Sequence, residues 1–140
     1  MFHILLIDGA ADTATLMTAV NQGSYRPCRL HHVTDGPSAM HFLNRTDHHE
    51  QAPRPDLVIL NLEWPRQSGL EVLSAIKGSP QWCALPVIVM SPADPDAITR
   101  AYALHANCCV VRPDDTRSLV QVMHSIEHFW TTVAKLPTHH

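Results

Sequence analysis

The chain has 140 residues, enough for one sizeable core and too few for two ordinary domains, so we expect one domain over 1–140, with its core in about 1–134 and a tail in 135–140. Apolar residues make up 45% of the chain and the formal net charge is -3, which is typical of a globular protein and argues against binding to nucleic acid. The amino terminus has no cationic stretch before its short apolar run, so we predict a cytoplasmic protein that does not enter a membrane.

The spacing of cysteine and histidine argues against a structural metal site. The cysteines lack the CxxC spacing of zinc ligands, and adjacent cysteines rarely bridge each other, so we expect reduced, buried thiols. They are Cys28, Cys83, Cys108 and Cys109. Of the eleven histidines, only His124 and His128 have the spacing that places two rings on one helical face, and no third ligand lies near them in the sequence. We therefore predict no metal ion.

Short apolar runs alternate along the chain with amphipathic stretches. This rhythm is typical of βαβ units, in which parallel strands are buried on both faces and read as unbroken apolar segments. The predicted strands are His3–Ile7, Cys28–Val33, Leu57–Leu60, Pro86–Met90 and Cys108–Val111. The predicted helices begin near Asp12, Gly36–Pro37, Ser68–Gly69, Asp94–Pro95 and Asp114–Asp115, where capping residues stand. The fold class is therefore α/β, with a doubly wound parallel sheet.

The last predicted helix has the clearest periodicity. Its apolar residues recur at spacings of three and four, which gives one stripe against the sheet. They are Leu119, Val122, Met123, Ile126, Phe129, Trp130 and Val133. The inner residues are expected in the core. Phe129 and Trp130 exceed what one sheet face needs, so we expect them to extend a surface for a partner.

In a doubly wound sheet, ligands bind beyond the carboxyl ends of the strands. The residues that follow the predicted strands are Asp8–Gly9, Asn61–Leu62–Glu63, Ser91–Pro92 and Arg112–Pro113. These positions form the candidate site.

The chain resembles the receiver domains of two-component response regulators over essentially its full length. The resemblance is carried by Ile4–Asp8, Asp35–Ala39, Arg54–Leu62, Pro65 with Ser68–Leu70, Leu85–Ser91 and Val111–Pro113. It implies a flavodoxin-like (βα)5 fold with strand order 2-1-3-4-5. Leu104–Cys109 and the stretch from Ser125–Trp130 to Lys135–Pro137 are similar to a narrower group, the stand-alone receivers that partner phytochrome-type histidine kinases and commonly form homodimers.

The resemblance also implies a site that has lost its central chemistry. In the family, two adjacent acids after the first strand bind Mg²⁺, and here they correspond to Asp8 and Gly9. The phosphate-accepting aspartate corresponds to Asn61, whose carboxamide is a poor nucleophile. Glu63 stands where the family offers a backbone carbonyl to the metal. With Asp8 as the remaining carboxylate, we expect Mg²⁺ binding to be weak or absent.

The anion-binding half of the site differs as well. Ser91 corresponds to the switch hydroxyl, but the next residue is Pro92, which has no N–H to offer a phosphoryl oxygen. Arg112 replaces a lysine and is expected to pair with Asp8 or Glu63. The switch aromatic corresponds to Cys109, which is too small to swing as a ring does.

Two readings of the altered site remain. In the first, a hydrogen-bond network of Asp8, Asn61, Ser91 and Arg112 merely stabilises the fold; in the second, Ser91 and Arg112 retain an anion site. The favoured function is a phosphorylation-independent, non-enzymatic pseudo-receiver that contacts a sensor histidine kinase or a second copy of itself. The alternative is a phosphate sink in which Glu63 accepts the phosphoryl group.

The expected partner surface comprises the fourth helix, the fifth strand and the fifth helix. Aromatic and arginine side chains, which interfaces favour, are clustered there in the sequence. They are Tyr102, His105, Arg117, Phe129 and Trp130. Charge reversal at Arg117 combined with truncation of Trp130 is expected to convert a dimer to a monomer.

Overall fold

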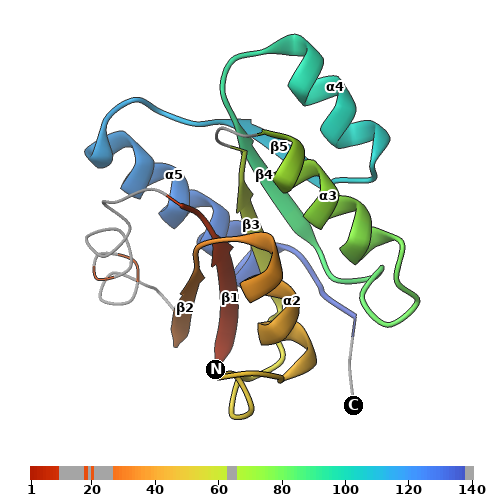
Figure 1. The fold of residues 1–140 in the computed structure, drawn as a ribbon. Helices are drawn as coiled ribbons and strands as arrows, with labels where there is room; N and C mark the ends of the chain where they lie inside the picture. Colours follow the sequence, from red (N-terminus) through yellow and green to blue (C-terminus); the bar gives the residue numbers. More distant parts are fainter. Residues whose placement is uncertain (10–17, 19, 21–26, 63–65, 138–140) are drawn as a thin grey trace.

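The computed structural model describes residues 1–9, 18, 20, 27–62 and 66–137. Within these residues the chain forms a five-stranded parallel sheet with the strand order β2-β1-β3-β4-β5 (Figure 1). The predicted fold class and strand order are confirmed. The helix predicted near Asp12 lies outside the described residues, as do Glu63 and Pro65.

The strands agree with the apolar runs to within one or two residues. They are β1 (Phe2–Ile7), β2 (Cys28–Val33), β3 (Leu57–Asn61), β4 (Val87–Ser91) and β5 (Cys108–Val111). β3 and β4 are buried along their whole length, as expected for central strands of a parallel sheet. Each runs one residue beyond its apolar segment, so that Asn61 and Ser91 belong to the sheet.

Helices cover both faces of the sheet, and successive strand residues point to opposite layers. Figure 1 shows α2 (Gly36–Asn44), α3 (Arg66–Lys77) and α4 (Pro95–Ala103) on one face and α5 (Thr116–His128) on the other. Leu5 and Ile7 join the core on the α2–α4 side, whereas Ile4 and Leu6 join the core beneath α5. This alternation gives the molecule two apolar layers.

Aspartates cap three of the helices, as the sequence predicts. Asp35, Asp94 and Asp115 each accept a hydrogen bond from a backbone N–H in the first turn of the helix that follows. α3 begins at Arg66, two residues before its predicted start.

The end of α5 differs from the predicted stripe. The helix passes into a π-helical turn, Phe129–Val133, in which the Thr131 hydroxyl donates to the Glu127 carbonyl at 2.8 Å. The wider turn breaks the spacing of three and four, so Phe129 stays 47% exposed while Trp130 packs against the core beneath α5. Trp130 is thus half-buried and lines the apolar groove beside β5, so the prediction that both rings extend a partner surface stays a prediction.

Two further features concern the surface and the tail. All four cysteines are free, but the prediction of buried thiols holds for Cys28 and is wrong for the exposed Cys83. Leu136 and Pro137 of the tail line a small cavity of about 110 Å³ together with Arg54 and Pro55. Among the described helices, none has the length and apolar character that crossing a bilayer requires.

Candidate functional site

The sheet gathers the predicted site residues at the carboxyl ends of its strands. Asp8 directly follows β1, Asn61 ends β3, Ser91 ends β4 and Arg112 directly follows β5. Asp8, Asn61 and Ser91 are 3%, 8% and 0% exposed. Polar side chains this deeply buried need hydrogen-bond partners, because burying an unpaired polar group is costly.

The carboxylate of Asp8 is the centre of the site, and both of its oxygens are engaged. The Asn61 amide Nδ2 donates to Asp8 Oδ1 at 3.0 Å, and Arg112 Nη1 donates to Asp8 Oδ2 at 3.1 Å. The second contact is also an ion pair between two largely buried groups. The predicted pairing of Arg112 with Asp8 is what the structure contains, and it balances the charge of the carboxylate with that of the guanidinium.

The carboxamide of Asn61 is oriented by this contact. A carboxylate only accepts hydrogen bonds, so the amide nitrogen must face Asp8. The amide oxygen Oδ1 is consequently directed elsewhere, and it is buried without a hydrogen-bond partner among the residues that the structure describes. A buried acceptor of this kind costs about 1–3 kcal/mol.

These residues do not fit the Mg²⁺ site that the family resemblance implies. A hard divalent ion takes several oxygen ligands, yet the guanidinium of Arg112 and the amide of Asn61 already occupy the Asp8 carboxylate. Among the described residues there is also no cluster of three or more side chains suited to a metal ion. The cationic group in this site is Arg112.

Gly9 is not required by the backbone. No glycine among the described residues has a positive φ, and a Cβ added at Gly9 would meet the Thr34 carbonyl oxygen at 3.6 Å, an ordinary contact. A side chain would therefore fit the described surroundings of this position. The backbone does not require glycine in place of the family's second acid.

Ser91 does not join the network predicted for it. Its hydroxyl donates to the carbonyl of Pro92 at 2.8 Å, while its own backbone carbonyl accepts from the Arg112 N–H at 2.9 Å. Arg112 is thus paired with Asp8 and the Ser91 hydroxyl with a local carbonyl, and the retained anion site of the second reading stays a prediction.

Two contacts from neighbouring elements were not predicted from the sequence. His32 on β2 places Nε2 2.6 Å from the backbone oxygen of Asp8. Tyr102 on α4 accepts a hydrogen bond from the backbone N–H of Cys109 at 3.1 Å. The contact of His32 follows from strand register, since β1 and β2 run side by side. Tyr102 was predicted only as a partner residue, and no pattern in the sequence pairs either side chain with these backbone groups.

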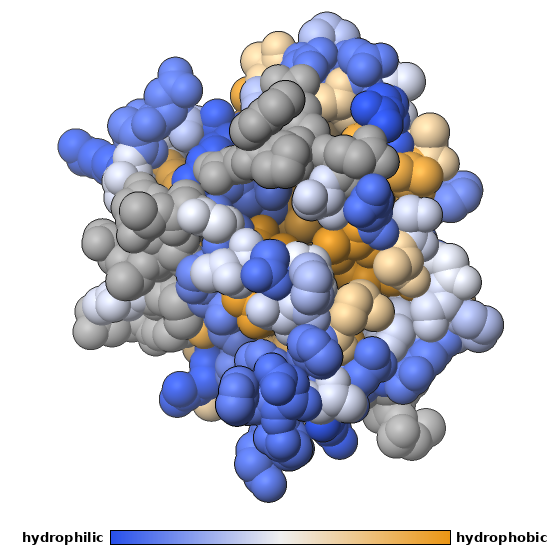
Figure 2. Space-filling model, viewed as in Figure 1, coloured by the Kyte–Doolittle hydropathy of each residue, from blue (hydrophilic) through white to orange (hydrophobic). Residues whose placement is uncertain are grey.

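A hollow of about 240 Å³ lies beside Asp8 and Asn61, between the first turns of α2 and α3 (Figure 2). Its lining includes Gly36 and Gly69, where a side chain would approach Val72 and Leu62 to 2.5 Å. Asp35 stands at its rim, and the backbone N–H of Ser38 lowers the pKa of that carboxyl below its usual value. The hollow thus has acidic and apolar walls.

The predicted partner residues lie on α4, on the turn that follows it, on α5 and on the π-helical turn that continues α5. Tyr102 is 50% exposed, and His105 and Arg117 are exposed as well. Phe129 stands edge-on to the half-buried Trp130, with 5.4 Å between ring centroids. Beside them, β5 and α5 form an apolar groove that includes Cys108, Val110, Val122 and Ile126.

Residues 4–124 match the response regulator receiver domain family. The chain belongs to this family. Its sequence is 33% identical to the response regulator Rcp1 of Synechocystis sp. over 135 residues, covering 96% of this chain and 92% of that protein.

Solved receivers agree with the fold closely. The Mn²⁺-bound form of Rcp1 superposes with a TM-score of 0.87 at 32% identity, covering 99% of this receiver and 100% of that chain. The phosphorylated cyanobacterial phytochrome response regulator RcpA gives a TM-score of 0.87 at 34% identity, covering 98% and 99%. The receiver is thus similar over its whole length to phytochrome response regulators.

Proposed function

We propose that this receiver works in two-component signalling through protein contacts alone, without accepting a phosphoryl group. The observation that carries the proposal is the occupation of Asp8 by the amide of Asn61 and the guanidinium of Arg112. A phosphoryl acceptor needs a free carboxylate beside a divalent cation. In this site the acceptor position holds the carboxamide of Asn61, and the Asp8 carboxylate that would help to hold the cation is engaged by other groups.

The contrast with the similar proteins supports this assignment. Rcp1 has been solved with bound Mn²⁺ and RcpA in a phosphorylated form. This chain keeps their fold, but its site residues favour a closed ion pair over a metal ion. The receiver therefore retains the shape that a kinase or another receiver recognises and acts as a non-enzymatic binding module.

The proposed partners are a cytoplasmic sensor histidine kinase, in particular one of the phytochrome type, and a second copy of this chain. The first rests on the similarity to phytochrome response regulators. The second rests on the apolar groove between β5 and α5 and on the exposed ring of Phe129 at its edge. Exposed apolar surface of this kind is typical of protein interfaces.

The test is incubation of the purified protein with a small phosphodonor and Mg²⁺, followed by intact-mass measurement. The expected result is an unchanged mass, with a receiver that has an intact aspartate pair as the positive control. A gain of one phosphoryl group would overturn the proposal. If that gain disappeared in Glu63→Ala, the surrogate acceptor would be Glu63.

The partner is tested by affinity capture from native cytosol followed by mass spectrometry. Recovery of a histidine kinase or its cognate regulator would support a role within a phosphorelay. Recovery of unrelated proteins alone would contradict it and would mean that the receiver fold serves a different pathway.

A further inference from the structure

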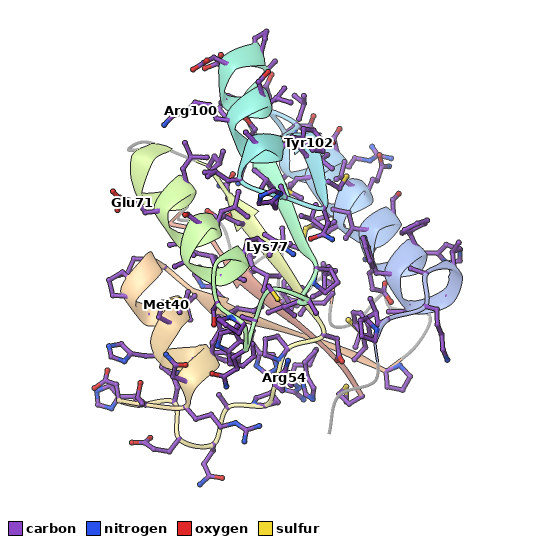
Figure 3. The ribbon with its side chains drawn as sticks, turned by 90° about the vertical axis from the view of Figure 1, so that its right-hand side faces the viewer. Met40, Arg54, Glu71, Lys77, Arg100 and Tyr102 are labelled. Carbon is purple, nitrogen blue, oxygen red and sulfur yellow. The ribbon has the colours of Figure 1, made fainter. Side chains whose placement is uncertain are left out.

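Tyr102 makes an unusual contact between a helix and the edge of the sheet. β5 is an edge strand, so the backbone groups on its outer side have no neighbouring strand to pair with. The backbone N–H of Cys109 finds its acceptor in the phenol oxygen of Tyr102, at 3.1 Å. Figure 3 shows Tyr102 on the flank of α4 that faces β5 and α5, with Arg100 on the other flank.

The contact is important because α4 itself buries only small side chains against the sheet. The fully buried residues of the helix are Ala97 and Ala101, which bury far less apolar area than the leucines of α3. The hydrogen bond from the Cys109 N–H to Tyr102 therefore supplements the packing of Leu104 on the core in fixing the last turn of α4.

The turn from α4 to β5 is itself under strain. His105 has φ 72°, in the left-handed region that a residue with a side chain seldom adopts. The conformation is held by hydrogen bonds on both sides of it: Ala106 N–H donates to the Ala101 carbonyl at 3.1 Å, and Asn107 Oδ1 accepts from Val87 N–H at 2.9 Å. The hydrogen bond from the Cys109 N–H to Tyr102 is a further restraint, two residues after Asn107.

We infer that Tyr102 is a latch that fixes α4 and the outer edge of β5 in one arrangement. The side chain of Cys109 is a half-buried thiol, which is too small to hold α4 against β5 by itself. Another protein can contact the side chain of Tyr102, because it is 50% exposed. A protein that contacts the phenol therefore acts directly on the position of α4, without any change at Asp8 or Asn61. This inference extends the proposed function, but its test needs no partner.

The test is residue-resolved amide hydrogen exchange on the dilute protein and on Tyr102→Phe, which keeps the ring and removes the acceptor oxygen. Exchange at Cys109 is expected to accelerate by about five- to tenfold. Exchange at Leu104 and Ala106, which close the last turn of α4, is expected to rise by about two- to fivefold because that turn loses its tie. Cys109→Ala keeps the backbone N–H and the phenol, so its rates at position 109 should match the native protein after correction for sequence.

The inference is overturned if Cys109 exchanges at the native rate in Tyr102→Phe. It is also overturned if Cys109 alone accelerates, because the bond would then be local and would not position α4. An equal acceleration across β3 and β4 would indicate global destabilisation and would equally contradict a latch. None of these outcomes depends on whether the receiver accepts phosphate, so failure of the latch and failure of the proposed function are distinguishable.

Discussion

Asn61 determines the chemistry of the site through its amide nitrogen. Donation from Nδ2 to Asp8 removes one acceptor oxygen of the carboxylate, and Arg112 takes the other. An aspartate at position 61 would instead place two carboxylates at hydrogen-bond distance, where mutual repulsion disfavours ionisation of both. In the family this repulsion is what a cation relieves. In this receiver Asn61 carries no charge, so no repulsion arises between the side chains at positions 8 and 61.

Asn61→Asp is therefore expected to lower the free energy of unfolding at neutral pH by about 1–3 kcal/mol in chelator, and millimolar Mg²⁺ is expected to restore part of the loss. The native protein should show the same free energy of unfolding with Mg²⁺ as with chelator. Urea denaturation under both conditions measures these values.

The matched control is Asn61→Ala, which removes the donor without adding charge. It is expected to cost about 1 kcal/mol and to be insensitive to Mg²⁺. Stabilisation of the native protein by Mg²⁺ would contradict the assignment of Arg112 as the cation of the site.

At the scale of elements, β1 and β2 are joined by a histidine pair in addition to their backbone ladder. His3 Nδ1 lies 2.9 Å from His31 Nε2, and the ring of His31 contacts Phe42 of α2 with centroids 5.4 Å apart. Burial lowers the pKa of both imidazoles below 6.5. For His3 the nearby Asp56 opposes this shift, whereas Arg29 adds to it for both rings.

A lowered pKa in the folded state means that the unfolded chain binds more protons as the solution is acidified. The stability that the neutral pair contributes is present above pH 6.5 and is lost as the pH falls from 6.5 through the folded-state pKa. His31→Gln keeps a hydrogen-bonding side chain that does not titrate, so the fall in unfolding free energy between about pH 7.5 and pH 5 should be smaller in this variant, by less than about 1 kcal/mol.

Urea titrations at several pH values measure this slope. His48→Gln, a change at an exposed loop histidine, is the control and should keep the native slope. A native protein whose stability does not fall between neutral and mildly acidic pH would contradict the role of the pair.

For the whole molecule, the sequence predicted the sheet because buried parallel strands read as unbroken apolar runs. It placed the ends of β3 and β4 one residue early, since Asn61 and Ser91 end the apolar run while the ladder continues to their partners Met90 and Val111. The periodicity of α5 failed beyond His128, because a π-helical turn changes the number of residues per turn.

The contacts of the candidate site were also predictable only in part. The ion pair of Asp8 with Arg112 follows from charge and from the meeting of strand ends at one edge. The contact of Ser91 does not, because a hydroxyl rotates to the nearest acceptor and here that is the Pro92 carbonyl one residue away. The contact of His32 with the Asp8 carbonyl required the register of β1 and β2, which apolar patterning alone does not fix to one residue.

The position of Trp130 also changes how self-association should be tested. Trp130 packs against the core beneath α5, so its truncation would create a cavity and destabilise the fold along with any interface. Phe129 is 47% exposed and contacts Trp130 edge-on at the edge of the β5–α5 groove, so its truncation is expected to cost the folded monomer less than truncation of Trp130. An exposed ring beside an apolar groove is what a two-fold interface would bury on both copies.

Phe129→Ala combined with Arg117→Glu is therefore expected to shift a dimer to monomer, with an unfolding midpoint close to that of the native monomer. Sedimentation equilibrium measures the mass, and urea denaturation at low protein concentration checks the fold. Gln81→Ala, at an exposed position in the segment before β4, is the control and should leave the dimer intact. A native protein that is monomeric at high concentration would remove the second copy as a partner of the groove, whereas a double variant that stays dimeric would place the interface on another face of the receiver.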